Sequence, residues 1–240
     1  MGVMSEHMPG GRLPEDPSPE ARFNALFDAW AATYDAVVSG ADDEYAEVFA
    51  GYDRILERVA GEIDRPPGAL VVEIGVGTGN LTQKLLARGY RVIGVEPSQA
   101  MRREARRKVP EADVREGSFL HLPLDEAGGE AYVDAFVSTY AFHHLTDAEK
   151  EMALRRMAAR LAPEGRIVFA DTVFADEAAR QAVIEEARRR GFHQLLRDLE
   201  QEFYPLLSDL EDILARVGLH AVFERLNRYV WMWKAVRRRP

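Results

Sequence analysis

Residues Val71–Asn80 read V-V-E-I-G-V-G-T-G-N, an apolar run that leads into three glycines at alternate positions. Further along the chain, a second apolar run ends in Gly94-Val95-Glu96. Glycine adopts backbone angles that other residues avoid, so this loop can turn tightly from a strand into a helix and let a ligand approach the backbone. Together the two signals predict a nucleotide-like ligand at the carboxyl end of a parallel sheet.

The composition of the chain favours one soluble domain that acts on a small molecule. Its 240 residues, 47% of them hydrophobic, can bury one substantial core. A formal net charge of -9 disfavours nucleic acid as a partner, because phosphate binding needs clustered Lys and Arg. The absence of cysteine excludes disulfides, thiolate metal sites and cysteine nucleophiles. Without a bilayer-length apolar segment or a signal-like start, we expect a cytoplasmic protein with no membrane partner.

Shifts in composition divide the chain into a leader and one domain. Residues 1–19 are rich in Gly, Pro and acid and predict a disordered leader. Within the domain, residues 20–240, apolar positions recur at helical spacing from Phe23 to Val38 and from Tyr45 to Val59. The expected parts of this domain are an N-terminal helical cap (20–65), a cofactor-binding core (69–173), a helical insertion (175–207), and a final helix with a strand hairpin (208–240).

Strands and helices alternate through the core. The expected strands cover residues 70–74, 91–95, 113–115, 133–138, 166–170, 219–226 and 229–236. The expected helices after the cap cover residues 80–88, 98–108, 146–161 and 208–217, and residues 176–207 form a long, charged, helical stretch. This order predicts an α/β fold: a Rossmann-like, doubly wound, seven-stranded and mostly parallel sheet with an antiparallel C-terminal strand.

The spacing of the glycines favours S-adenosylmethionine over a dinucleotide. A dinucleotide fingerprint is G-x-G-x-x-G, in which the helix that follows faces a pyrophosphate. Here Gly75, Gly77 and Gly79 alternate, and Asn80 stands where the fingerprint has its third glycine. Glu73, near the end of the strand, is placed to neutralise an amino group, which S-adenosylmethionine carries. The alternative is a tight strand-to-helix turn that binds no ligand.

Glu96 ends the second strand, where a carboxylate can accept hydrogen bonds from two adjacent ribose hydroxyls. Pro97 follows it and belongs to the expected cofactor site. Taken alone, Glu96 is also compatible with a solvated strand end. On the next helix, the basic run from Arg102 to Lys108 predicts a solvated face balanced by nearby acids rather than a nucleic-acid site.

These motifs resemble those of the class I S-adenosylmethionine-dependent methyltransferases, which carry E/D-x-G-x-G-x-G and an acidic residue at the end of the second strand. Three further stretches are similar to those of the YrrT-type bacterial methyltransferases: F-D-A-W-A-A-T-Y-D (Phe27–Asp35), S-T-Y-A-F-H-H-L-T-D (Ser138–Asp147) and F-A-D-T-V-F (Phe169–Phe174). The resemblance implies an adenine contact in the loop after the third strand. Many members have an acid-aromatic pair there, whereas this chain has Gly117, Ser118 and Phe119. We expect Ser118 and Phe119 to make the contact, with core packing as the alternative for Phe119.

The end of the fourth strand carries the expected methionine and acceptor contacts. Ser138 and Tyr140 lie where ligands bind in an open parallel sheet, and we expect both at the methionine end of the cofactor. Adjacent side chains point in different directions, so either His143 or His144 reaches the pocket as a general base and the other is structural. A histidine hydrogen-bonded to a loop carbonyl is the simpler alternative. In similar enzymes a leading helix folds over the cofactor, and Tyr34 is the residue expected to close over its methionine part.

The expected reaction is methyl transfer to an oxygen, nitrogen or sulfur nucleophile of a small molecule, with release of S-adenosylhomocysteine. A sulfonium is a good leaving group, so the protein mainly aligns the acceptor, excludes water and removes a proton. Two alternatives remain: an NAD-dependent oxidoreductase, which Asn80 argues against, and a non-catalytic protein that binds S-adenosylmethionine or S-adenosylhomocysteine. No spacing of His, Asp and Glu predicts a metal site. Trp231 and Trp233 share one face of the last strand, and we expect a monomer or a homodimer.

Overall fold

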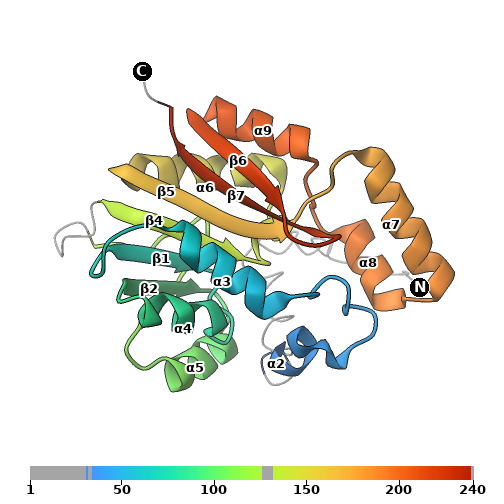
Figure 1. Cartoon of the computed structure of the whole chain (residues 1–240), viewed down its shortest axis with the longest axis horizontal. Helices are drawn as coiled ribbons and strands as arrows, with labels where there is room; N and C mark the ends of the chain where they lie inside the picture. Colours follow the sequence, from blue (N-terminus) through green and yellow to red (C-terminus); the bar gives the residue numbers. More distant parts are fainter. Residues whose placement is uncertain (1–30, 32–33, 126–131, 239–240) are drawn as a thin grey trace, which may run out of the picture.

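Among the residues that the computed structural model describes (31, 34–125 and 132–238), seven strands form one sheet in the order β3-β2-β1-β4-β5-β7-β6 (Figure 1). The strands are β1 (Leu70–Ile74), β2 (Arg91–Glu96), β3 (Asp113–Glu116), β4 (Val133–Thr139), β5 (Leu161–Thr172), β6 (Leu219–Arg225) and β7 (Val230–Arg237). β7 runs antiparallel to β5 and β6, whereas the other neighbouring pairs are parallel. The predicted Rossmann-like α/β class is confirmed. β5 begins at Leu161, earlier than expected, where it pairs with Val133.

Part of the N-terminal prediction lies outside the described residues. The expected leader (1–19) and most of the helix expected from Phe23 fall there. The described end of that helix consists of α2 (Tyr34–Ala36) and the π-helical turn η1 (Val37–Ala41). The next helix, α3 (Tyr52–Glu62), begins later than the expected Tyr45, because Gly51 adopts a left-handed φ of 75° and turns precede it.

The remaining helices cover both faces of the sheet (Figure 1). They are α4 (Asn80–Ala87), α5 (Gln99–Lys108), the 3-10 turn η3 (Phe142–His144), α6 (Asp147–Arg160), α7 (Glu177–Arg190), α8 (His193–Gln201) and α9 (Leu207–Arg216). A capping box of Thr146 and Glu149 opens α6. The helical stretch expected over 176–207 consists of two helices, because Gly191, with φ 73°, ends α7 and α8 follows.

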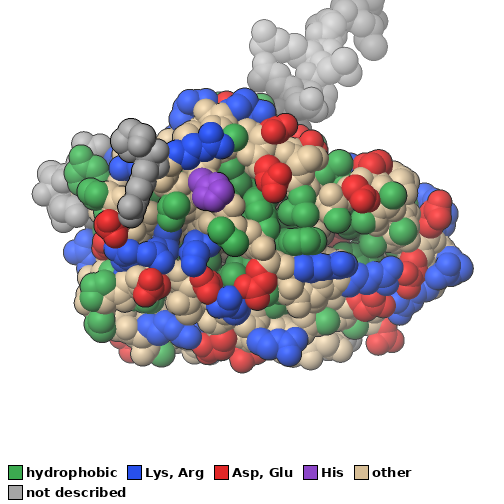
Figure 2. All heavy atoms as spheres, turned by 45° about the horizontal axis from the view of Figure 1, so that its top comes forward, with side chains coloured by type: hydrophobic (Ala, Val, Ile, Leu, Met, Phe, Trp, Pro, Cys, Tyr) green, Lys and Arg blue, Asp and Glu red, His purple; other side chains and the backbone are tan. Residues whose placement is uncertain are grey.

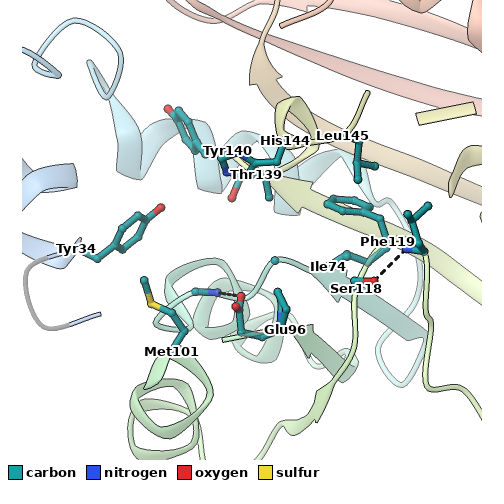
Figure 3. Close-up of a pocket in the computed structure, with 15 residues that line it drawn as sticks. Tyr34, Ile74, Glu96, Met101, Ser118, Phe119, Thr139, Tyr140, His144 and Leu145 are labelled. Carbon is teal, nitrogen blue, oxygen red and sulfur yellow. Dashed lines mark hydrogen bonds between the residues drawn. The ribbon is translucent and has the colours of Figure 1, made fainter. Parts of the chain in front are cut away.

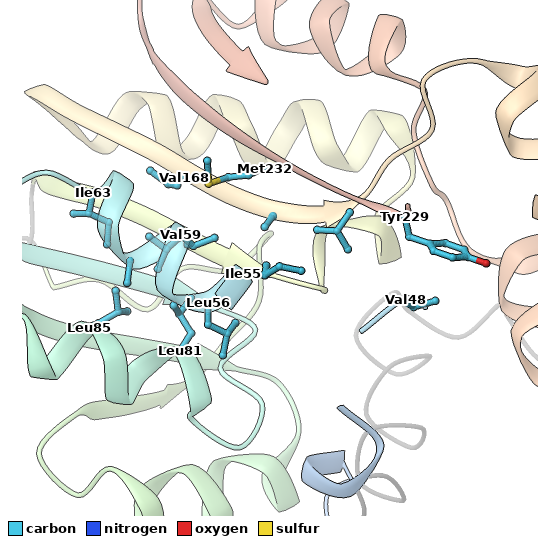
Figure 4. Close-up of a cluster of buried hydrophobic side chains, with 14 of the residues drawn as sticks. Val48, Ile55, Leu56, Val59, Ile63, Leu81, Leu85, Val168, Tyr229 and Met232 are labelled. Atoms are coloured by element: carbon cyan, nitrogen blue, oxygen red, sulfur yellow. The ribbon is translucent and has the colours of Figure 1, made fainter. Parts of the chain in front are cut away.

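Alternate strand residues divide the core between the two faces of the sheet. Val71 packs in the layer that includes α3, α4, α7 and α8, whereas Val72 packs in the layer that includes α6 and α9. Figure 4 shows the first layer, in which Ile55 and Val59 of α3 are 2% and 0% exposed. Burying each such side chain stabilises the fold by about 1.5–3 kcal/mol. This packing fixes α3 on the sheet with Tyr52, its first residue, beside the end of β4.

Candidate active site

A pocket at the carboxyl ends of β1, β2 and β4 encloses about 810 Å³ of empty space, its open mouth included (Figure 3). The lining residues that the sequence predicts for the site are Tyr34, Gly75, Gly77, Glu96, Pro97, Ser118, Phe119, Tyr140 and His144. Motif spacing does not reveal the other lining residues, which are Ile74, Met101, Leu120, Thr139, Ala141 and Leu145. Five residues predicted for the site are not in this lining: Glu73, Gly79, Asn80, Ser138 and His143.

Glu96 ends β2 with only 4% of its surface exposed, and it lines the pocket. Its Oε2 accepts a hydrogen bond from the backbone N–H of Gly77 at 3.0 Å, and its Oε1 accepts one from Ser98 at 2.9 Å. Arg102 donates to the carbonyl oxygens of Glu96 and Pro97 at 2.8 and 2.6 Å. Because Arg102 is 6% exposed, the solvated face expected for the whole basic run is wrong at this residue. The carboxylate is held in place at the pocket, where it can accept hydrogen bonds from paired hydroxyls.

The three glycines have different surroundings. Gly75 has φ 76°, and a Cβ there would lie 2.7 Å from the Cβ of Ala141. Gly77 also has a left-handed φ, of 56°. A Cβ at Gly79 would instead lie 3.1 Å from Cγ2 of Val109 at the end of α5. Gly75 and Gly77 therefore keep the pocket open, whereas Gly79 lets α4 pack close to α5.

Glu73 and Ser138 are buried beside the pocket without lining it. Oε2 of Glu73 accepts a hydrogen bond from Oγ1 of Thr82 at 2.6 Å. Burial raises the pKa of Glu73 to about 8, so the carboxyl is protonated at neutral pH unless a cation approaches it. Oγ of Ser138 donates to the carbonyl oxygen of Ile74 at 2.6 Å and joins the ends of β4 and β1.

The described end of the N-terminal segment is fastened to the glycine loop. Oδ1 of Asp35 accepts hydrogen bonds from Oγ1 of Thr78 at 2.6 Å and from Nδ2 of Asn80 at 3.0 Å. Nζ of Lys108 donates to Oδ2 of Asp35 and to Oδ1 of Asn80, both at 2.7 Å. Asn80 therefore holds the segment that places Tyr34 at the pocket (Figure 3).

The loop after β3 lines another part of the pocket. Oγ of Ser118 accepts hydrogen bonds from the N–H groups of Leu120 and His121, each at 3.2 Å, and so shapes the turn. Phe119 is 6% exposed, and its ring meets that of Phe142 edge-on, with 5.4 Å between centroids. Phe119 therefore combines core packing with a place in the pocket lining.

Tyr140 occupies a strained position directly after β4. Its φ of 55° is a left-handed conformation that is uncommon outside glycine. Its ring centroid lies 5.0 Å from that of Phe49 and 5.6 Å from that of Tyr52. Its hydroxyl is buried and has no hydrogen-bond partner among the described residues. A buried polar atom without a partner costs stability.

His143 is held by Asp171, at the end of β5. Oδ1 of Asp171 lies 2.6 Å from Nδ1 of His143, and Oδ2 accepts the backbone N–H groups of Phe142 and His143 at 2.6 and 3.1 Å. Burial opposes protonation of His143, but the charge and hydrogen bond of Asp171 outweigh it and raise the pKa. The His143 ring also stacks on Tyr204, with 4.9 Å between centroids. These contacts fix His143 outside the pocket lining.

His144 does line the pocket, and it pairs with Glu202. Nδ1 of His144 lies 3.0 Å from Oε2 of Glu202, a residue of the helical insertion. Burial and the neighbouring His143 lower the pKa of His144, so its ring is neutral at pH 7. The sequence does not single out Glu202 or Asp171, because both are distant from the histidines along the chain.

Charges of both signs are mixed on the face of the molecule that Figure 2 shows. Figure 2 shows Lys and Arg side chains beside Asp and Glu on one face. In the basic run, Arg107 pairs with Glu104 at 2.6 Å. Within residues 34–125 and 132–238, no helix combines the length and apolar character needed to cross a membrane. The same residues include no group of three or more His, Cys, Asp and Glu side chains that could hold a metal ion.

Comparison with known proteins places the chain in a family. Residues 71–165 match the family described as Methyltransferase domain. A protein of Geobacillus kaustophilus (strain HTA426), named as an uncharacterised methyltransferase, is 49% identical over 216 residues, which cover 90% of this chain and 97% of the relative. A protein of Bacillus cytotoxicus with the same description is 47% identical, with coverage of 90% and 98%. The solved structure of magnesium protoporphyrin IX methyltransferase (ChlM) from Synechocystis PCC 6803, with bound SAM, has a TM-score of 0.68 at 16% identity and coverage of 92% and 98%.

The sheet order, the antiparallel β7 and the pocket at the strand ends are those of class I S-adenosylmethionine-dependent methyltransferases. The chain belongs to this family, within which the Geobacillus and Bacillus methyltransferases are its relatives. Because the chain belongs to a methyltransferase family, the alternative of an NAD-dependent oxidoreductase has no support. The narrower resemblance to YrrT-type proteins stays a prediction.

Proposed function

We propose that this chain transfers a methyl group from S-adenosylmethionine to a small-molecule acceptor by in-line displacement and releases S-adenosylhomocysteine. The observation that carries the proposal is the pocket in which Glu96, the glycine loop and Tyr140 meet. A pocket of this kind suits a small acceptor. The mixed charges of the face in Figure 2 offer no continuous basic surface to a nucleic acid.

The described residues fit the cofactor. Glu96 is placed to accept hydrogen bonds from the ribose hydroxyls, and Gly75 leaves space that a Cβ would fill. Tyr140, which lines the pocket directly after β4, would lie at the methionine end of the cofactor. Glu73, just before the glycine loop, would neutralise the amino group directly or through water. When bound, S-adenosylmethionine supplies a methyl group already activated for displacement.

The remaining pocket residues complete the proposed binding mode. Phe119 and Ser118 would contact the adenine, and Pro97 would pack beside it. Tyr34, held through Asp35, would close over the methionine part and exclude water from the reacting groups. Exclusion of water favours transfer to the acceptor over hydrolysis.

Calorimetry tests this function against the alternatives. We expect S-adenosylmethionine and S-adenosylhomocysteine to bind the wild-type protein, and NAD to show no binding. Tight binding of NAD without binding of S-adenosylmethionine would overturn the proposal. If S-adenosylmethionine binds but no acceptor leads to release of S-adenosylhomocysteine, the chain is a binding protein rather than an enzyme.

A further inference from the structure

His144 and Glu202 belong to separate segments that meet at the pocket. His144 ends η3, and Glu202 directly follows α8 in the insertion. The side chains are 12% and 18% exposed, and Nδ1 of His144 lies 3.0 Å from Oε2 of Glu202. When a carboxylate accepts the Nδ1–H of an imidazole, it fixes the tautomer in which the proton is on Nδ1 and the lone pair is on Nε2. A ring of this tautomer in a pocket lining is arranged as a general base.

Backbone contacts hold the two segments together. The N–H of Phe203 donates to the carbonyl oxygen of His143 at 3.0 Å. Lys150 is fully buried, and its Nζ donates to the carbonyl oxygens of Phe203, at 2.7 Å, and of Leu145. These backbone contacts therefore keep the segments of Glu202 and His144 together, so their positions do not depend on the hydrogen bond between the two side chains alone.

His143 is less suited to the same task. Its Nδ1 and backbone N–H both contact the carboxylate of Asp171, which also accepts the N–H groups of Phe142 and Thr172. This carboxylate organises the start of η3, and His143 lies outside the pocket lining. His143 and Asp171 therefore support the turn that presents His144.

We propose that His144 is the general base of methyl transfer, that Glu202 is its positioning residue, and that the acceptor is an uncharged molecule with a protic alcohol, phenol or thiol group. This inference rests on the proposed function and names the substrate class of the same site. It also gives the helical insertion a part in the chemistry, because Glu202 belongs to it.

The charges around the pocket favour an uncharged acceptor. None of the described residues that line it is Lys or Arg, and the carboxylate of Glu202 lies beside His144. A carboxylate or phosphate of the acceptor beside His144 would lose its water without gaining a cationic side chain, and it would lie near Glu202. An uncharged protic group avoids this cost and gives the base a proton to remove.

The atoms and charges of this step balance. The acceptor's proton passes to Nε2 of His144 as a lone pair of the acceptor atom forms the bond to the methyl carbon. The bond from carbon to sulfur breaks, and its electron pair stays on sulfur in neutral S-adenosylhomocysteine. Glu202 stabilises the imidazolium, which then releases the proton to solvent.

Nitrogen-15 NMR of the histidine rings, with S-adenosylhomocysteine added, tests the pair without any acceptor. We expect wild-type His144 to carry its proton on Nδ1 at neutral pH. Glu202→Gln should lower the pKa of His144 by about one unit or more, because an opposite charge this close favours the imidazolium. The charged groups around His144 include His143 and Asp171, which stay in place in this variant. A proton on Nε2, or an unchanged pKa, would overturn the role of Glu202.

Release of S-adenosylhomocysteine tests the base and the substrate class together. The probes are alcohols, phenols and thiols, each compared with a matched carboxylate and phosphate monoester. We expect methylation of uncharged probes, and we expect His144→Gln to lower kcat by about 10²–10⁴-fold. Its affinity for S-adenosylmethionine should stay within about threefold. Glu202→Gln should shift the acid limb of the pH–rate profile to lower pH.

The matched control is Glu200→Gln, on the exposed side of α8. Glu200 is 48% exposed and pairs with Arg188, so this variant should keep the wild-type rate and pH profile. Methylation of only the carboxylates or phosphates, or a His144→Gln rate close to that of the wild type, would overturn the inference. Failure of the wild-type protein to bind S-adenosylmethionine would instead overturn the proposed function.

Discussion

Replacing Glu96 with Gln tests the expected ribose contact. The side chain is 4% exposed, and its two oxygens accept backbone N–H groups at 3.0 and 2.9 Å. Gln keeps the shape of the side chain, but its NH2 group cannot accept a hydrogen bond, so one of these two contacts is lost together with the charge. Hydrogen bonds to charged groups contribute about 1.5–3 kcal/mol, against about 0.5–1.5 kcal/mol for neutral ones. Removing the charge should therefore weaken S-adenosylmethionine binding by about 1–3 kcal/mol and raise Kd by about 5- to 150-fold.

Titration calorimetry measures this change, and urea unfolding shows whether the variant is folded. Glu116→Gln is a matched control, because Glu116 pairs in register with Glu96 on β3 and its side chain is 77% exposed. Its Kd should stay within about threefold of wild type. An unchanged Kd in folded Glu96→Gln would refute the ribose role of Glu96.

Three further substitutions test other parts of the site. Gly75→Ala places a Cβ 2.7 Å from the Cβ of Ala141 at a φ of 76°. We expect urea unfolding to show a free energy of unfolding lower by about 1–2 kcal/mol or more, and titration to show a raised Kd for S-adenosylmethionine. Wild-type values of both would contradict the close approach. Asp35→Asn removes a half-exposed ion pair with Lys108 that contributes about 0.2–1 kcal/mol. Stopped-flow measurement should show S-adenosylmethionine dissociating a few-fold faster from this variant. An unchanged dissociation rate would show that the segment carrying Tyr34 and Asp35 does not hold the cofactor. Burial raises the pKa of Glu73 from 4.5 to about 8, so as the pH rises this carboxyl ionises in the unfolded chain before it ionises in the folded one. The stability of the fold therefore falls between these two pH values, and Glu73→Gln should remove this fall in thermal unfolding. The same pH dependence in wild type and variant would argue against a buried neutral acid.

The cofactor half of the fold could be predicted because its signals are local. The apolar run before Gly75 and the run ending at Glu96 each specify a strand and its end, and parallel pairing then brings the two ends together. The predicted bounds of β1 agree with the structure. Glycine decides one helix boundary that the periodicity misplaces, because Gly51 delays the start of α3. Gly191 divides the helical insertion into α7 and α8.

The acceptor half could not be predicted to the same depth, because its contacts join distant parts of the chain. Glu202 reaches His144 only after α7 and α8 fold back over the sheet, and no periodicity in the sequence records that pairing. Arg102 looked like one of several surface cations, yet it supports the end of β2 from within. Asp171 lies in a stretch quoted for its family resemblance, which is the one signal that could have marked it.

Release of S-adenosylhomocysteine by the wild-type protein is the most direct test of the central claim. The protein is incubated with S-adenosylmethionine and a panel of small metabolites, and mass spectrometry follows both products. We expect S-adenosylhomocysteine to accumulate in step with one new product, heavier than its parent by a methylene group. Firm binding of S-adenosylmethionine with no release above the protein-free control, across the whole panel, would contradict it.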